Sequence, residues 1–365
     1  MTFVDPNSAG VVVVNWNGWK DTIECLEAVF RMEHFSGVVV VCDNGSVDGS
    51  LENIEAWARG DLCAVPESHS AALRSLVLPP MNKPLDTIRI DPRNLTLPIS
   101  VIKSNVRLFL VDLGENCGFA AANNVGLRLL SSIDRIDTFW LLNNDALPAR
   151  DAYRELALLM ATTGGALICG STLIEYWEPE KIQACGASYN VFFGRSKHLL
   201  EGQAISELKK LGSSVAVDYP VGASLAVNRA FLGRYGAMSE DYFLYFEEID
   251  WVVRKGWPRN ALVSTSSLVF HKGGKSTLAG RDPGKRSLLA DYYLIRGRLL
   301  FARKYSWLSF ILTIFVSLLA VLRRVNRPAP GGVINAFWAF MDGCCRFSRS
   351  PFAQNPQREK WLRLP

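Results

Sequence analysis

Two runs of four valines, Val11–Val14 and Val38–Val41, constrain the fold of this chain more than any other feature. Between them, Ile23, Leu26 and Phe30 recur at the spacing of one helix face. The chain therefore has a strand, a helix and a strand at the length of a right-handed βαβ unit. Near-continuous apolar strands are typical of a parallel sheet that is covered on both faces. We therefore predict an α/β fold with a mostly parallel sheet.

Composition narrows the class of protein. The chain has 365 residues, of which 49% are hydrophobic, enough for one large domain or two small ones, so global disorder is excluded. Its eight cysteines form no CxxC pair and no zinc-binding spacing, which indicates free thiols in a reducing compartment. No basic segment with a long apolar run opens the chain, so we expect no signal peptide and a catalytic part in the cytosol.

A polar cluster follows each valine run. Residues 15–18 (Asn-Trp-Asn-Gly) follow the first, and residues 43–50 follow the second. Open α/β sheets bind ligands at the carboxyl ends of their strands, so Asp43 beside Asn17 is placed to accept hydrogen bonds from a nucleobase or ribose. A loop with a Ser or Asp helix cap is the alternative. GxGxxG and GxxxxGK[ST] are both absent, which indicates nucleotide binding without a glycine cradle.

Residues 138–145 (Thr-Phe-Trp-Leu-Leu-Asn-Asn-Asp) are an apolar run that stops on two amides and a carboxylate. A buried strand that ends on an acid suggests an active site, because Asp is a hard oxygen ligand for Mg²⁺ or Mn²⁺ carrying a phosphorylated substrate. The alternative is a polar turn, since Asn, Asp and the nearby Pro148 are ordinary turn residues.

The middle of the chain is less regular. Residues 60–105 hold several prolines and little periodicity, so we predict an insertion or long loop, either a lid or a partner surface. Apolar residues return at 106–111, and small residues then follow Gly118. Small residues let a helix begin close to a ligand, where Asn123 and Asn124 can bond sugar hydroxyls or diphosphate. A tightly packed helix start is the alternative.

Glu247 and Glu248 are adjacent acids in an aromatic setting. Desolvation and mutual repulsion raise the proton affinity of such acids, which suits a catalytic base. The alternative is a helix start where acids are favoured by the helix dipole. Asp250 and Arg254 have the i, i+4 spacing of a structural ion pair.

The net charge of +5 is unevenly distributed: residues 1–280 hold 25 Lys and Arg against 31 Asp and Glu, and residues 281–365 hold 15 against 4. Within this basic tail, the uncharged stretch 305–322 is bracketed by Arg303-Lys304 and Arg323-Arg324. Cations at the borders of an apolar segment favour an anionic membrane surface over nucleic acid, which would interleave aromatic and basic residues along a groove.

Hydroxyl side chains recur at helical spacing within this stretch. They are Ser306, Ser309, Thr313 and Ser317. Such a helix lies in the membrane interface or packs its small face on a neighbour. Because crossing a bilayer takes about 20 apolar residues, we favour interfacial attachment over a single span. A buried core helix is the remaining alternative. A second short apolar helix is expected after the breaker at 327–332.

Five segments occur in the order seen in family 2 glycosyltransferases, and the chain resembles their rhamnosyltransferase-like branch. They are residues 13–18, 43–50, 116–124, 142–145 and 243–251. The resemblance covers roughly residues 10–300, and the ordered set is more specific than any one member. It implies the GT-A fold, in which a Rossmann-like nucleotide-binding half merges with an acceptor-binding half. We therefore divide the chain into a catalytic domain, 1–285, and a membrane-associating helical tail, 286–365.

The resemblance also implies a metal site. Asn143-Asn144-Asp145 occupies the place of the family's DxD motif and retains only its last acid, so Asp145 is the expected ligand of Mg²⁺ or Mn²⁺. A histidine downstream of the acceptor half often completes such a site, and His271 fits because it follows an apolar strand pattern. A structural role is the alternative for a lone histidine.

Further roles follow from the same resemblance. Asp43 would contact the base, and Gly222 would let the backbone approach the donor sugar. The other expected nucleotide-sugar contacts are Asn15, Asn17, Ser46, Asp48, Gly118, Phe119, Asn123, Asn124, Asn143 and Asn144. Relatives carry Glu-Asp where this chain has Glu247-Glu248, so the base maps to Glu248 and Glu247 stays open as an alternative.

The resemblance implies an inverting transferase that uses a nucleotide-diphosphate sugar and usually a divalent cation. We expect transfer of rhamnose or another hexose to a hydroxyl of a polyprenyl-linked acceptor or a growing surface oligosaccharide, at the cytoplasmic face of the plasma membrane. Nucleic acid is not an expected partner. A non-catalytic nucleotide-sugar-binding or scaffold protein is the alternative. A nucleotidyltransferase would need a glycine-rich, Lys- or Arg-bearing loop after the first strand, and residues 15–18 provide none.

Overall fold

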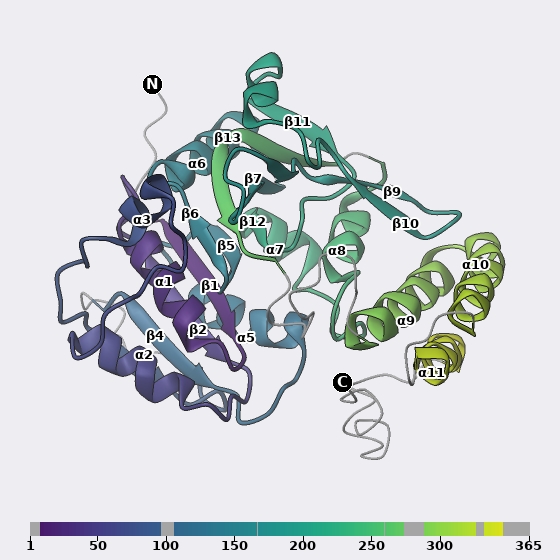
Figure 1. Ribbon diagram of the computed structural model, residues 1–365, viewed down its shortest axis with the longest axis horizontal. Coiled ribbons are helices and arrows are strands. Elements are labelled where there is room, and N and C mark those ends of the chain that lie inside the picture. The colour runs from purple at the N-terminus through teal and green to yellow at the C-terminus, as the bar shows by residue number, and fades with distance from the viewer. Residues whose placement is uncertain are drawn as a thin grey trace.

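The computed structural model describes residues 8–95, 106–165, 167–258, 260–273, 288–325 and 332–345. Its centre is an eleven-stranded sheet with the order β11-β13-β7-β12-β5-β1-β2-β4-β3, in which β6 also pairs with β13 and β8 with β7 (Figure 1). The strands of this sheet are β1 (Ala9–Asn15), β2 (Val38–Asp43), β3 (Thr87–Ile90), β4 (Leu108–Asp112), β5 (Thr138–Asn143), β6 (Ala146–Pro148), β7 (Ile168–Glu175), β8 (Ile182–Ala184), β11 (Ser214–Val217), β12 (Ser224–Asn228) and β13 (Ala261–His271).

Helices cover both faces of the sheet. The described helices are α1 (Trp19–Phe30), α2 (Ser50–Arg59), α3 (Ala71–Val77), α5 (Phe119–Ser131), α6 (Ala152–Thr163), α7 (Arg229–Tyr235), α8 (Glu247–Lys255), α9 (Leu288–Tyr305), α10 (Trp307–Val325) and α11 (Gly332–Cys345), with the 3-10 helix η1 (Ile205–Lys210). Of these, α1, α2, α3 and α6 lie on one face of the sheet and α5 lies on the other. A separate two-stranded hairpin consists of β9 (Ala187–Asn190) and β10 (Arg195–His198).

The strand directions confirm an α/β fold with a mostly parallel, mixed sheet. β1 is parallel to β2 and β5, and the parallel order continues through β4 to β3. β12 is antiparallel to both of its neighbours, β5 and β7, while β7 and β13 are again parallel. The valine runs are β1 and β2, and alternate side chains pack on opposite faces: Val11 and Val13 with α1, α2, α3 and α6, and Val12 with α5.

The register of the central strands brings their polar ends together. Asn15, the last residue of β1, pairs with Asp43 of β2, and Val14 pairs with Asn143 of β5. These residues therefore lie at one edge of the sheet, as expected for consecutive parallel strands. The glycines that follow sit where turns need them: Gly45 has φ +75°, and a Cβ there would lie 2.6 Å from the backbone of Glu115.

The segment 60–105 is more ordered than predicted. Its described part, 60–95, contains the helix α3 and the edge strand β3, which pairs in parallel with β4. Glu27 of α1 holds this segment: its Oε1 accepts a hydrogen bond from Lys83 Nζ at 2.7 Å, and its Oε2 accepts one from the Met81 amide at 3.0 Å. The predicted long loop is thus partly an extension of the sheet. Residues 96–105 lie outside the described part.

The C-terminal helices form a group at one end of the molecule, with α9 next to α8 (Figure 1). Arg296 of α9 is fully buried and donates to the carbonyls of Asp241 and Tyr242, both at 3.0 Å. Asp250 of α8 accepts a hydrogen bond from Tyr305 at 2.9 Å, besides its expected ion pair with Arg254 at 3.3 Å. The predicted boundary at residue 285 therefore does not separate α9 from the body.

The C-terminal helices and the cysteines can be compared with the sequence predictions. Of the helices in the described ranges, none combines the length and the apolar character needed to cross a membrane. The second apolar helix expected after the breaker is α11. All eight cysteines lie in the described ranges, and all are free thiols.

Candidate active site

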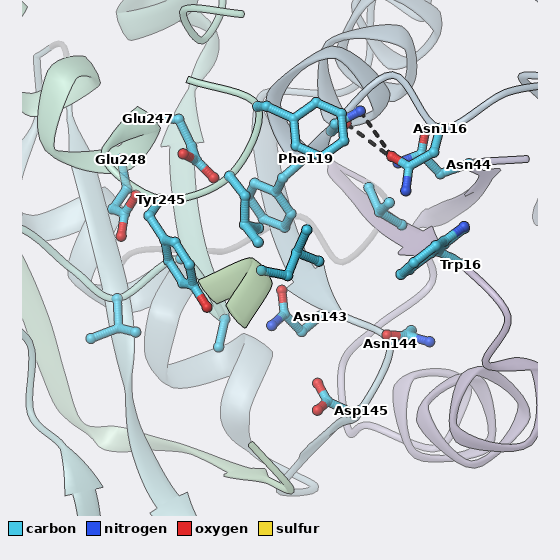
Figure 2. Close-up of a pocket in the computed structure, with 18 of the residues that line it drawn as sticks. Trp16, Asn44, Asn116, Phe119, Asn143, Asn144, Asp145, Tyr245, Glu247 and Glu248 are labelled. Carbon is cyan, nitrogen blue, oxygen red and sulfur yellow. Dashed lines mark hydrogen bonds between the residues drawn. The ribbon is translucent and has the colours of Figure 1, made fainter. Parts of the chain in front are cut away.

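A cavity of about 280 Å³ lies at the sheet edge where β1, β5 and β13 end, and the start of α8 closes it from the other side. Nine predicted site residues line it: Gly118, Phe119, Asn143, Asn144, Asp145, Gly222, Glu247, Glu248 and His271. Figure 2 shows Glu247 and Glu248 on one side and Trp16, Asn44 and Asn116 on the other, with Asn143, Asn144 and Asp145 below them. The topology thus brings acids from β5 and α8 into one cavity.

Asp145 holds an unsatisfied carboxylate. It is 3% exposed, and neither of its oxygens accepts a hydrogen bond of normal geometry within the described ranges. His271 Nε2 lies 3.1 Å from Asp145 Oδ1 as an ion-pair contact. The backbone fixes the pair, because the amide of Lys272 donates to the carbonyl of Asp145 at 3.0 Å. A buried carboxylate without hydrogen bonds is costly unless a cation or a ligand compensates it.

Gln183 of β8 orients the ring of His271. Its Oε1 lies 2.7 Å from His271 Nδ1, while its Nε2 donates to Glu175 Oε2 at 3.2 Å and to the His271 carbonyl at 3.4 Å. With the amide nitrogen occupied by two acceptors, the oxygen accepts a hydrogen bond from Nδ1–H. Nε2 is then the ring nitrogen that faces Asp145, 3.1 Å from its Oδ1. Such outer partners commonly fix the tautomer of a metal-ligating histidine.

Charge interactions dominate the protonation of this pair. Burial alone would raise the pKa of Asp145, but the charges of His271 and Lys272 outweigh it, so the pKa lies below its ordinary value. Burial lowers the pKa of His271, but the charge and the close contact of Asp145, together with the charge of Glu175, more than reverse this, so that pKa lies above its ordinary value. Each group therefore favours the charged form of the other.

The residues at this corner fit a divalent cation. The Asp145 carboxylate, whose oxygens have no hydrogen-bond partner in the described ranges, lies 3.1 Å from the imidazole Nε2 of His271. In the described ranges no cluster of three or more His, Cys, Asp or Glu is placed to hold a metal. Mg²⁺-type sites often use one or two protein ligands and complete their shell with water and substrate phosphates. Asp145 and His271 match that arrangement.

The surroundings of Glu247 and Glu248, at the start of α8, disfavour the ionised form of both acids. Glu247 is 3% exposed, and its Oε2 has no hydrogen-bond partner in the described ranges. Burial, and then the neighbouring Glu248, raises the pKa of Glu247 well above its ordinary value. Burial raises the pKa of Glu248 to about 7. A carboxyl group that titrates near neutrality is suited to general base catalysis.

The backbone before this pair is strained and is held by its neighbours. Phe243, Tyr245 and Phe246 have φ between 67° and 73°, a region that non-glycine residues rarely adopt. The ring of Phe243 stacks on Tyr293 of α9 with centroids 4.7 Å apart. On the other side, the Phe119 amide donates to the Phe243 carbonyl at 2.8 Å. Gly118 permits this approach, because a Cβ there would lie 2.7 Å from that carbonyl.

The expected base-binding edge is a closed hydrogen-bond network. Asp43 Oδ2 accepts from Asn15 Nδ2 at 2.6 Å and from the Ser46 hydroxyl at 2.7 Å, while Asp43 Oδ1 accepts from the Ser46 amide at 2.9 Å. Asn17 joins through its amide, which donates to Ser46 Oγ at 2.8 Å. None of these four residues lines the cavity. Their bonds shape the turns around it, and base contact by Asp43 stays a prediction.

Other predicted contacts have structural partners. Asn124 donates to the Met238 carbonyl at 3.0 Å and to Glu240 at 2.9 Å, and Asn123 donates to the Phe119 carbonyl within its own helix. Asp48 accepts from the Ser50 amide at 3.1 Å. Asn123 and Asn124 are buried and do not line the cavity, and their expected contact with sugar or diphosphate stays a prediction.

Two predicted lining residues have distinct surroundings. The Asn144 amide donates to the Thr22 hydroxyl at 3.1 Å and so ties the end of β5 to α1. A Cβ at Gly222 would meet Glu248 Cδ and Phe119 Cε1 at 3.9 Å, an ordinary contact distance. The glycine is therefore not required by protein packing, and it leaves room beside Glu248 for a ligand.

Several lining residues were not predicted. Trp16, Asn44 and Asn116 lie opposite the acids (Figure 2), and the Asn44 amide donates to Asn116 Oδ1 at 2.9 Å. Trp16 and Asn44 stand inside motifs that the sequence singles out, so an aromatic or amide directly after a strand end was the available signal. Tyr245 belongs to the aromatic surroundings of the acids. Leu289 of α9 has no local signal, because only the packing of α9 brings it to the cavity.

Comparisons with known proteins give fold-level similarity alone. No protein-family model matches the chain, and no curated protein matches it. Among solved structures, S. aureus TarS 1–349 is 12% identical, with 92% of this chain and 81% of that chain covered and a TM-score of 0.47. Mannosyltransferase PcManGT from Pyrobaculum calidifontis, in complex with GDP-Man and Mn²⁺, is 15% identical, with 99% and 82% covered and a TM-score of 0.46.

A complex of S. aureus TarS 1–349 with UDP-GlcNAc is 13% identical, with 92% and 81% covered and a TM-score of 0.44. Because all these TM-scores lie below 0.5, we base function on the residues of the cavity. The family 2 resemblance, its rhamnosyltransferase-like branch and the GT-A fold stay predictions.

Proposed function

We propose that this chain is an inverting glycosyltransferase of the GT-A type that takes a sugar from a nucleotide-diphosphate donor. The observation that supports this most strongly is that one cavity contains both an acid suited to act as a base and an acid suited to bind a metal. Glu248 has a pKa of about 7, and Asp145 is an orphaned carboxylate beside His271. Direct displacement at an anomeric carbon needs both a base and a site for the departing diphosphate.

Glu248 acts as the base in this proposal. The hydroxyl oxygen of the acceptor attacks the anomeric carbon, and its proton passes to the Glu248 carboxylate. The bond between that carbon and the diphosphate oxygen breaks, and the electron pair leaves with the nucleoside diphosphate. Burial and the neighbouring Glu248 raise the pKa of Glu247 well above its ordinary value, which makes Glu247 the less suitable base of the pair.

Asp145 and His271 would hold the divalent cation, Mg²⁺ or Mn²⁺. When bound, the cation supplies positive charge that stabilises the departing diphosphate. Gln183 keeps the His271 ring in the orientation that points Nε2 at this position. Trp16, half-exposed on the far side of the cavity from the acids, is placed to contact the nucleoside.

The acceptor in this proposal is a hydroxyl of a polyprenyl-linked or growing surface glycan, and the sugar is rhamnose or another hexose. The side of the cavity next to α9 is apolar, lined by Phe243, Leu244 and Leu289. The same side chains pack on the core of the C-terminal helices. We place the enzyme at the cytoplasmic face of the plasma membrane, attached peripherally through those helices.

A nucleotide-sugar-binding protein without catalysis is the second candidate, and the single retained acid of Asn143-Asn144-Asp145 favours it. A screen of nucleotide sugars for Mn²⁺-dependent release of nucleoside diphosphate separates the two. The transferase hydrolyses at least one donor slowly, with water in place of the acceptor. Donor binding without release in every case would support the second candidate instead.

A further inference from the structure

The helix α10 buries its small polar side chains and exposes its large apolar ones. Ser309, Thr313 and Ser317 are at most 1% exposed. Seven apolar side chains are between 39% and 74% exposed: Trp307, Leu308, Ile311, Phe315, Leu318, Leu319 and Leu322. At 3.6 residues per turn, the seven lie within an arc of about 120° and the hydroxyls lie opposite. A helix on a water-soluble surface has the reverse arrangement.

The helix α11 repeats this arrangement. Asn335 is 4% exposed and donates to the Leu288 carbonyl of α9 at 2.7 Å, and Asp342 is fully buried and accepts from the Tyr292 hydroxyl. On the outer face, Ile334, Phe337 and Trp338 are between 37% and 49% exposed. Polar groups that face the inside of a helix group, with apolar groups outside, are typical of helices in contact with lipid.

The hairpin β9-β10 carries a second exposed apolar group. Phe192 and Phe193, at its turn, are 49% and 50% exposed. The turn is fixed to α9, because Arg298 Nε donates to the Gly194 carbonyl at 2.9 Å. The base of the hairpin also packs there, since the Tyr189 ring lies edge-on to Phe301 at 5.3 Å. The aromatic tip therefore has a fixed place relative to the C-terminal helices.

The charges around these faces are positive. Arg195 and Lys197 are exposed on β10, and Arg303 is exposed where α9 meets α10. In β9-β10, α10 and α11 the only described acidic residue is Asp342, which is buried. A surface of this kind complements anionic lipid head groups. A symmetric contact between two copies would instead oppose like charges.

We infer that the outer faces of α10 and α11 and the tip of β9-β10 form one surface that binds an anionic lipid bilayer at its interfacial region. Lipid binding by this surface does not depend on the proposed function. Only the role of the attachment, which is to bring the transferase to its acceptor, rests on it. Trp307 and Trp338 are amphipathic rings suited to head-group depth. The attachment uses two elements that are distant in sequence and joined through α9.

Flotation of the full chain with vesicles tests this surface. We expect the protein to float with vesicles of phosphatidylcholine and phosphatidylglycerol, and to bind phosphatidylcholine alone at least about fivefold more weakly. The measurement needs neither donor nor metal, so its outcome is independent of whether the chain transfers sugar. Absence of binding to both kinds of vesicle would overturn the inference.

Two double variants locate the surface. F315S with L319S on α10, and F192S with F193S on the hairpin, should each weaken vesicle binding at least about tenfold, because each removes two apolar side chains from the lipid contact. V65S removes a side chain that is 81% exposed elsewhere and serves as the control. All substituted residues are exposed, and an unchanged thermal midpoint verifies folding.

Unchanged affinity in either double variant would exclude a surface made of both elements. Light scattering supplies a further contradicting outcome. If the wild-type chain self-associates, the α10 variant is monomeric and neither binds vesicles, the face is a contact between copies.

Discussion

Two edges beside the cavity carry similar polar residues, which differ in whether their hydrogen-bonding atoms have partners. At the ends of β1 and β2, Asn15, Asp43 and Ser46 satisfy one another with bonds of 2.6 to 3.1 Å. At the end of β5 and the start of α8, Asp145 and Glu247 are equally buried but retain oxygens without hydrogen-bond partners in the described ranges. Burial alone therefore does not distinguish the two edges, whereas the balance of donors and acceptors does.

The difference separates scaffold from chemistry. A closed network stabilises the fold, and removal of one member leaves its partners unsatisfied. At the open edge, the charges of His271 and Lys272 stabilise the ionised Asp145, while its oxygens have no hydrogen-bond partner in the described ranges and can bind a ligand. Substitutions at the closed edge should therefore lower stability, and substitutions at the open edge should lower function with little loss of stability.

The largest expected effect is at Glu248. Glu248→Gln removes the ionisable base and should lower the turnover number by about 10³-fold, within the range for loss of a general base. Glu247→Gln is the matched control, because burial and Glu248 disfavour the charged form of Glu247, and its turnover should stay within about tenfold of wild type. Steady-state kinetics with donor binding measured in parallel decide the question. The reverse ranking would assign the base to Glu247.

The next comparison sets Asp145 against Asp43. Asp145→Asn should weaken Mn²⁺ binding about 100-fold by calorimetry, and should lower the free energy of unfolding by less than Asp43→Asn does, because it removes only the charge that pairs with His271. Asp43→Asn should lower the free energy of unfolding by about 2 kcal/mol, because it disrupts the bonds from Asn15 and Ser46, and should leave Mn²⁺ binding within about twofold. Equal loss of stability in both variants would abolish the distinction between the edges.

The pH dependence sharpens the assignment of the base. Glu248 must be ionised to accept a proton, and its pKa is raised to about 7. The value of kcat/KM should therefore rise about tenfold per pH unit below pH 7 and level off above it. A profile that is flat between pH 5.5 and about pH 8 would contradict a base of raised pKa.

The smallest expected effect concerns the orientation of His271. Gln183→Leu removes the acceptor of the Nδ1 hydrogen bond at 2.7 Å and should weaken Mn²⁺ binding about tenfold, as loss of an outer partner does in other metal sites. Gln203→Leu, an exposed substitution, is the control. Unaltered Mn²⁺ affinity in Gln183→Leu would reduce Gln183 to a packing role.

Sequence alone predicted the strands that carry the site, because their signal is local. The valine runs of β1 and β2 and the apolar run before Asn143 have strand composition, and each ends on its polar residues. The edge strand β3 was missed because pairing with β4 stabilises it, and Thr87–Ile90 has little periodicity of its own.

The candidate site was predictable where one residue type determines the chemistry, as for Asp145 and the acids of α8. The partners of Asn124 could not be predicted, because Met238 and Glu240 lie more than 110 positions away along the chain. Gln183 had no signal, since it matters only through contact with His271, 88 positions along the chain.

The anomeric configuration of the first-formed product tests the proposed mechanism most directly. That mechanism is a direct displacement in which Glu248 is the base and Asp145 and His271 hold the metal. Proton NMR follows the configuration as the wild-type chain with Mn²⁺ consumes the donor identified in the nucleotide-sugar screen. We expect the released or transferred sugar to appear with the configuration opposite to that of the donor, and release to fail in Glu248→Gln. A first product with the donor's own configuration would contradict the proposed mechanism.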